Sequence, residues 1–136
     1  MPVLLDTGFI VALLDRRERR HEECSLLLAD LPDSLVTCEA VVSEACYLLK
    51  HVKDASTAII ENVRRGDFLI PFRLAEHTTE LAGLLKKYSN VPMSLADACL
   101  VTMANQLETE RILTLERDFK IYRWGRNRPF ELLLEI

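Results

Sequence analysis

Acidic side chains follow or interrupt several hydrophobic segments of this chain of 136 residues. The set comprises Asp6, Glu44, Asp97, Glu116 and Asp118. Carboxylates that share one pocket repel each other unless a divalent ion neutralises them, and an all-oxygen donor set favours Mg²⁺ or Mn²⁺ over zinc. Such an ion lowers the pKa of a bound water and stabilises the charge of a phosphodiester transition state. We therefore hypothesise that these acids form one cation site for phosphodiester hydrolysis.

All of these acids except Glu44 also have a structural interpretation when they are taken alone. Asp6 can cap the N-terminus of a helix, as Asp often does. Asp97 stands three residues after Ser94, a spacing that makes a variant of the capping box. Glu116 and Asp118 can be solvated loop charges. The sequence alone leaves both interpretations open for these residues.

Glu44 has the strongest case from its local sequence. In a helix its neighbours include Val41, Ala45 and Leu48, so its side chain is expected at or beside the apolar stripe. An ionised carboxylate there is costly unless a cation or a donor compensates its charge. Lys50 is six positions further on, about 240° round the helix. A metal ion would supply the missing charge.

Short strand-like runs alternate with helical periods along the chain. Strands are predicted at 2–5, 35–37, 68–70, 111–114 and 130–136. Helices are predicted at 9–14, 15–30, 39–51, 54–65, 74–87 and 95–107, the second of them opening in the charged run 15–20. This alternation predicts one α/β domain, 1–136, with a central, mainly parallel sheet of about five strands flanked by helices. Acids that follow such strands can converge, because sites form beyond the carboxyl ends of the strands.

Composition restricts the class of protein and its compartment. The formal net charge of −4 argues against a surface built wholly for nucleic acid, and leaves room for a local basic rim and a basic partner. No apolar run reaches the roughly 18 residues of a membrane span, and no basic-then-hydrophobic leader is present, so we expect no membrane association and a cytoplasmic location. The four cysteines include no CxxC pair and the three histidines are scattered, which predicts buried reduced thiols and no zinc site.

Four segments resemble, in order, the motifs of the PIN domain family. They are Leu-Leu-Asp-Thr-Gly at 4–8, Val-Ser-Glu-Ala at 42–45, Ser-Leu-Ala-Asp-Ala at 94–98 and Ile-Leu-Thr-Leu-Glu-Arg-Asp-Phe at 112–119. Their order and spacing and the total length match one PIN domain, so the resemblance covers essentially the whole chain. The nearest subgroup is similar to the VapC-type toxin ribonucleases of bacterial and archaeal toxin–antitoxin pairs.

This resemblance implies a PIN-like three-layer sandwich and a Mg²⁺- or Mn²⁺-dependent endoribonuclease. Asp6, Glu44 and Asp97 would be the core acidic metal ligands, and Thr114 the small polar residue that supports them. The resemblance further implies an RNA substrate, a homodimer, and a VapB-like antitoxin whose basic segment covers the acidic pocket.

The chain departs from the family's pattern at two positions. Family members usually have Asp or Asn where Glu116 stands. The fourth acid, which the resemblance makes a metal ligand and a catalytic residue, is therefore either Glu116 or Asp118. Gly8 occupies a position where serine is frequent, and Thr7 is the residue that can keep the hydroxyl contact.

A basic and aromatic segment follows the fourth predicted strand, so we expect it to lie nearer the acidic site than the other basic run does. It contains Arg123, Arg126 and Arg128, with Tyr122 and Trp124 among them. This mix suits single-stranded RNA, whose bases stack on aromatic rings, and equally a structural corner of the fold. Arg16, Arg17, Arg19 and Arg20 form a second basic run, which would either contact RNA phosphates or be a solvated helix face.

Other functional classes fit the sequence less well. A receiver domain needs an adjacent acidic pair and a lysine after its last strand, and an Asp-x-Asp phosphatase needs an acid where Gly8 stands. The main alternative is a PIN-fold binding module that has lost catalysis. A metal-dependent DNA nuclease is also compatible, because acids that act on phosphate do not distinguish the sugars.

Overall fold

A parallel five-stranded sheet forms the centre of the computed structural model, which describes all residues 1–136. Its strand order is β3–β2–β1–β4–β7, and every neighbouring pair is parallel. The strands are β1 (Val3–Leu5), β2 (Leu35–Val36), β3 (Phe68–Leu69), β4 (Arg111–Leu113) and β7 (Glu131–Leu132). The predicted α/β fold with a mainly parallel sheet of about five strands is therefore confirmed.

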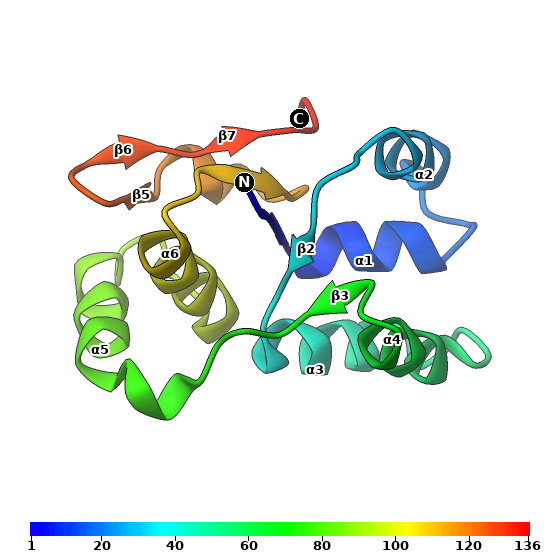
Figure 1. The fold of residues 1–136 in the computed structure, drawn as a ribbon, viewed down its shortest axis with the longest axis horizontal. Helices are drawn as coiled ribbons and strands as arrows, with labels where there is room; N and C mark the ends of the chain where they lie inside the picture. Colours follow the sequence, from blue (N-terminus) through cyan, green and yellow to red (C-terminus); the bar gives the residue numbers. More distant parts are fainter.

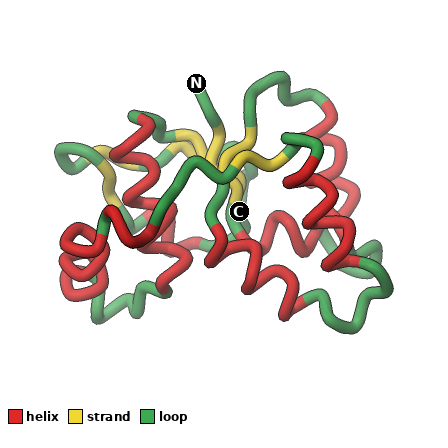
Figure 2. Tube along the Cα trace, turned by 60° about the horizontal axis from the view of Figure 1, so that its bottom comes forward, coloured by secondary structure: helices red, strands yellow, loops and turns green.

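Six α-helices flank this sheet. They are α1 (Thr7–Leu14), α2 (His21–Ala29), α3 (Glu39–Leu48), α4 (Ala55–Arg64), α5 (Thr78–Lys87) and α6 (Leu95–Leu107). Figure 1 shows α5 and α6 on one side of the molecule and α1 to α4 on the other, and Figure 2 shows the strands gathered between these two groups. No helix is long and apolar enough to cross a membrane.

The centre of the core is formed by β1 and α6. All three residues of β1 are fully buried, as expected for a parallel strand covered on both faces. In α6 the whole run 96–104 is buried, so this helix packs on every side and its polar Asp97 is carried into the interior. All four cysteines are free, and three of them are buried, in line with the predicted reduced thiols.

The prediction that the charged run 15–20 opens the second helix is wrong. Asp15 ends α1 by donating its backbone N–H to the Val11 carbonyl, and its side-chain Oδ1 accepts the backbone N–H of Arg17 at 3.0 Å. This local hydrogen bond holds the chain in a turn, as Asp side chains often do, and α2 begins only at His21.

Two further segments differ from the predicted elements. The helix expected over 74–87 is divided into a 3₁₀ turn, η1 (Leu74–Glu76), and α5, with His77 between them outside helical geometry. The segment after the 3₁₀ turn η2 (Arg117–Lys120) forms an antiparallel hairpin of β5 (Arg123–Trp124) and β6 (Arg128–Pro129) that was not predicted. Gly125 and Asn127 provide the positive φ angles of its turn, the conformation that Gly and Asn adopt most readily.

Candidate metal centre

The order of the strands creates a switch point beside β1. From β1 the sheet grows through β2 to β3 on one side, and the chain then returns to form β4 on the other side of β1. In open α/β sheets, ligands bind beyond the carboxyl ends of the strands at such a point. Asp6 leaves β1 there, and its backbone N–H donates to the carbonyl of Leu113, the last residue of β4, at 3.0 Å.

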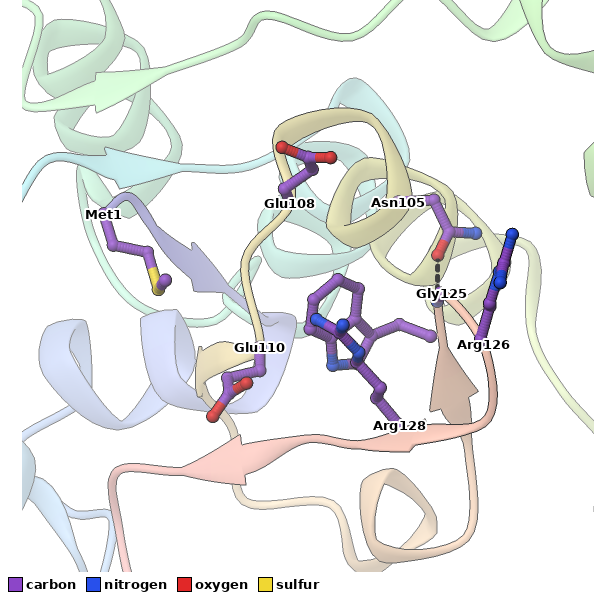
Figure 3. A pocket seen from close by; sticks show the side chains of 8 residues that line it. Met1, Asn105, Glu108, Glu110, Gly125, Arg126 and Arg128 are labelled. Atoms are coloured by element: carbon purple, nitrogen blue, oxygen red, sulfur yellow. Dashed lines mark hydrogen bonds between the residues drawn. The ribbon is translucent and has the colours of Figure 1, made fainter.

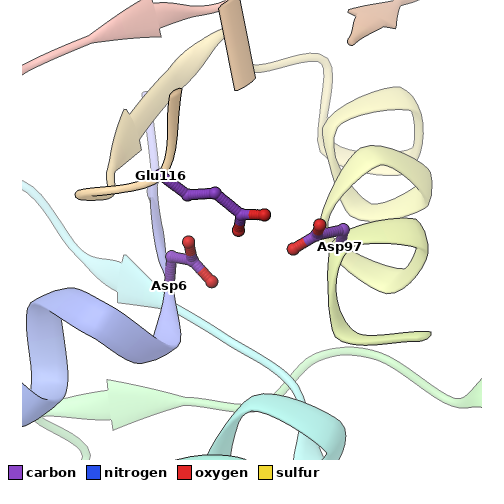
Figure 4. Close-up of side chains that lie close together, drawn as sticks. All are labelled: Asp6, Asp97 and Glu116. Carbon is purple, nitrogen blue, oxygen red and sulfur yellow. The ribbon is translucent and has the colours of Figure 1, made fainter. Parts of the chain in front are cut away.

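Three carboxylates meet at this switch point. Asp6, Asp97 and Glu116 each offer one oxygen, and these oxygens all lie within 4.8 Å of one another. Figure 4 shows the three side chains pointing toward a common centre from the end of β1, the first turn of α6 and the segment after β4. Asp6 and Asp97 are each 3% exposed, and Glu116 is half-buried. Three of the predicted acids are thus brought together although up to 110 positions separate them.

Asp6 both caps a helix and faces the acidic cluster. Its Oδ1 accepts the backbone N–H of Thr7 at 2.7 Å, which makes it the N-cap of α1. Its Oδ2 accepts the hydroxyl of Thr114 at 2.6 Å. The same hydroxyl accepts the backbone N–H of Glu116 at 3.0 Å. Thr114 therefore connects two of the three acids and fixes the course of the chain between them.

Asp97 is positioned by α6 and by a residue that the sequence did not reveal. Ser94 is the N-cap of α6, and its hydroxyl accepts the backbone N–H of Asp97 at 3.0 Å, so the predicted capping spacing is present. The phenol of Tyr122 donates to Asp97 Oδ2 at 2.8 Å. Tyr122 is fully buried, so the suggestion that it stacks on RNA bases is wrong. Trp124 is also buried, and its indole N–H donates to the Pro129 carbonyl at 3.2 Å.

Glu44 and Asp118 lie outside the three-residue cluster. Glu44 is exposed on α3, whereas Val41 and Ala45 are buried, so the argument from its burial is wrong. Its charge is still close enough to raise the pKa of Asp6. Asp118, half-buried in η2, forms a hydrogen bond with Glu116 that contributes to the raised pKa of that residue. Both acids therefore interact electrostatically with the cluster.

Burial raises the pKa of each carboxyl in the cluster. It raises the pKa of Asp6 to about 6, assisted by the charges of Asp97 and Glu44 and opposed by hydrogen bonds from Thr114 and Thr7. The pKa of Glu116 rises to about 9, through burial first and then the charges of Asp97 and Asp6. Burial also raises the pKa of Asp97, against a hydrogen bond from Tyr122. Without a cation, the folded cluster therefore retains a proton at neutral pH.

The donor set fits a hard divalent cation. None of the ion pairs of the structure includes a member of the cluster, so no Lys, Arg or His side chain balances its charge. The ligand atoms available are carboxylate oxygens, which Mg²⁺ and Mn²⁺ prefer. The hydroxyl of Thr7, next to Asp6 in the chain, is buried and has no hydrogen-bond partner. Asp6, Asp97 and Glu116 are accordingly the residues that can hold such an ion.

A hollow of about 510 Å³ lies at the opposite edge of the sheet (Figure 3). Met1 and Glu110, which precede β1 and β4, are among its lining residues. Its walls also include Trp124, under the guanidinium of Arg128 at 5.3 Å, and Arg126. Because these two arginines lie beyond the amino ends of the strands, the expectation that they sit near the acidic site is wrong.

Comparison with known proteins agrees with this architecture. The PIN domain family matches residues 3–125, and the chain belongs to that family. Ribonuclease VapC26 of Mycobacterium tuberculosis is 29% identical over 117 residues, which are 85% of this chain and 87% of that protein. The crystal structure of Mycobacterium tuberculosis VapC20, described as a sarcin–ricin loop cleaving toxin, superposes with a TM-score of 0.82. That match covers 93% of this chain and 99% of VapC20 at 20% identity, and it shows a shared PIN-like fold.

Proposed function

We propose that this protein is a Mg²⁺- or Mn²⁺-dependent endoribonuclease, the toxin of a VapBC-type toxin–antitoxin pair. The observation that carries the proposal is the cluster of Asp6, Asp97 and Glu116, whose oxygens lie within 4.8 Å of one another without a balancing cation from the protein. Membership of the PIN family and the similarity to a ribonuclease VapC support it.

Each acid has a distinct part in this site. Asp6 and Asp97 would be the buried ligands, held by hydroxyl donors, and Glu116 would be the third, in its carboxylate form. When bound, the ion supplies an activated water and positive charge beside the scissile phosphate. Glu44 and Asp118, which interact electrostatically with Asp6 and Glu116, would add negative charge around a bound ion.

A second hollow, of about 230 Å³, offers a place for the RNA backbone next to the acids. Its lining includes Gly8 and Leu115, which lie close to Asp6 and Glu116 in the chain, and the charged residues Glu18, Arg19 and Arg20. Arg20 is engaged with Glu23, whereas Arg19 is exposed. We assign Arg19 to an RNA phosphate, because exposed arginines bind phosphates at little structural cost.

The proposal includes the protein's partners and location. A VapB-like antitoxin would cover the acidic cluster with a basic segment and inhibit by charge and occlusion. A homodimer and a cytoplasmic location belong to the same functional assignment. Co-purification with the product of the neighbouring gene tests the antitoxin, and sedimentation tests the dimer.

Cleavage of labelled RNA and of matched DNA, with Mg²⁺, with Mn²⁺ and with EDTA, tests the activity. We expect metal-dependent cleavage of RNA that EDTA and the substitution Asp97→Asn abolish. Asn retains the backbone N–H that binds the Ser94 hydroxyl, so circular dichroism should show an intact fold. Asp30→Asn, on the exposed end of α2, is the matched control and should be fully active. Absence of cleavage, together with a melting temperature that metal does not raise, would favour the non-catalytic binding module instead.

A further inference from the structure

The two buried carboxylates of the cluster each accept a hydrogen bond from a buried hydroxyl. Thr114 donates to Asp6 Oδ2 at 2.6 Å, and Tyr122 donates to Asp97 Oδ2 at 2.8 Å. Thr114 lies within the sequence motif that follows β4, whereas Tyr122 lies outside all four motifs. We propose that Tyr122 is a positioning residue of the cation site, which fixes the orientation of the Asp97 carboxylate toward Asp6 and Glu116. This inference rests on the proposed function.

The ring of Tyr122 is held in one place by its surroundings. It is fully buried and packs edge-on against Tyr88 and Phe119, with centroids 5.0 Å away in both cases. Its backbone N–H donates to the carbonyl of Asp118 at 3.0 Å. Because neither the ring nor its backbone is free to move, the phenol presents its proton at a fixed point beside α6.

A fixed donor matters more for Asp97 than for an exposed acid. The Asp97 carboxylate is buried among other carboxylates, and its terminal torsion has only broad intrinsic preferences, so its orientation depends on the groups that contact it. A hydrogen bond from a hydroxyl to a carboxylate is charge-assisted and stronger than a neutral one. It occupies one oxygen and leaves the other available for an ion. Loss of such an outer contact typically weakens metal binding 10- to 100-fold.

The chain offers a closely matched pair of variants. Tyr122→Phe removes the hydroxyl that contacts Asp97. Tyr88→Phe removes a hydroxyl from the same aromatic cluster, one that accepts the backbone N–H of Arg123 at 3.0 Å and is not bonded to a carboxylate. Mn²⁺ binding to the full chain, followed through the electron paramagnetic resonance signal of free Mn²⁺, measures the site without reference to activity. Melting temperatures in EDTA measure stability alone.

We expect Tyr122→Phe to weaken Mn²⁺ binding about 10-fold or more, and Tyr88→Phe to bind Mn²⁺ as the unmodified protein does. Equal affinity in Tyr122→Phe and the unmodified protein would overturn the inference, and so would equal losses in both variants. If the unmodified protein bound no Mn²⁺, the cation site itself would be refuted, which is a distinguishable result.

A second measurement decides the matter if Tyr122→Phe does not fold. In the double variant Tyr47→Phe, Tyr88→Phe, Tyr122 is the remaining tyrosine. Binding of Mg²⁺ withdraws electron density from Asp97 and should change the ultraviolet difference spectrum of the Tyr122 phenol. A spectrum unaffected by saturating Mg²⁺ would overturn the inference.

Discussion

Without a divalent cation, the protein should become less stable as the pH rises through the titration of Asp6. Burial raises the pKa of this carboxyl from 3.8 to about 6 in the folded state. The folded protein therefore binds the proton more tightly than the unfolded chain does. The associated stabilisation is fully present below about pH 4 and is lost as the pH rises through about 6.

The size of this effect follows from the two pKa values. The difference between 3.8 and about 6 corresponds to about 3 kcal/mol, and roughly half of it falls between about pH 5 and pH 8. For a chain of 136 residues, a change of about 1.5 kcal/mol moves the melting temperature by about 5 °C. A cation at about 100 times its dissociation constant returns about 3 kcal/mol at the higher pH.

Thermal unfolding in EDTA at about pH 5 and about pH 8 measures the loss, and Asp6→Asn is the reference. Asn keeps an oxygen for the Thr7 backbone N–H but does not titrate, so the ionisable groups outside the acidic cluster cancel in the comparison. The unmodified protein should lose about 5 °C more than the variant, and Mn²⁺ should restore it at about pH 8. Equal pH dependence in both proteins would refute the raised pKa of Asp6. Failure of Mn²⁺ to stabilise the unmodified protein would refute the assignment of the cluster to a cation.

Three further substitutions test other parts of the structure. Thr114→Val should cost about 1–3 kcal/mol of unfolding free energy in urea, because a buried N–H and a carboxylate lose their hydroxyl partner; a loss below about 0.5 kcal/mol would contradict this role. Gly8→Ala should stabilise α1 by up to about 1 kcal/mol in the same assay, since the new Cβ meets Leu115 Cβ at an ordinary 3.6 Å, and destabilisation would show a tighter contact. Glu44→Gln should change stability by less than about 0.5 kcal/mol because the side chain is exposed, and should slow RNA cleavage at limiting Mg²⁺. An unaltered rate would remove Glu44 from the site.

The convergence of the acids was predictable from local sequence. The buried run of β1 ends directly at Asp6, and Thr114 directly follows the buried end of β4. Parallel strands bring their carboxyl ends to one edge, so residues that follow them become neighbours whatever their separation along the chain. The Ser94 to Asp97 spacing likewise fixed the start of α6. These inferences held because each depends on a strand end or a helix cap.

Where the sequence predicted a side chain's surroundings wrongly or left them open, those surroundings are decided by contacts between different segments of the chain. Helical periodicity put Glu44 at the edge of an apolar stripe, but which side of that edge faces solvent is decided by how α3 packs on α1 and α6. Tyr122 lies in a basic segment that suited RNA stacking and a structural corner of the fold equally well. Its burial depends on Phe119, Tyr88 and the carboxylate of Asp97, 25 positions away. No local pattern contains that information.

The structural and the chemical interpretations of the acids turn out to be compatible. Asp6 caps α1 with Oδ1 while Oδ2 faces Thr114, so one side chain does both. Asp97 takes part in the α6 cap through its backbone N–H, which leaves its carboxylate to Tyr122 and the cluster. The N-terminal caps of α1 and α6 thus hold the backbone of both acids in place without a bound ion. Asparagine keeps one oxygen for each cap or hydroxyl contact but replaces the other oxygen by an NH₂ group, so a folded Asn variant that no longer binds a cation shows that the second carboxylate oxygen and the charge are needed.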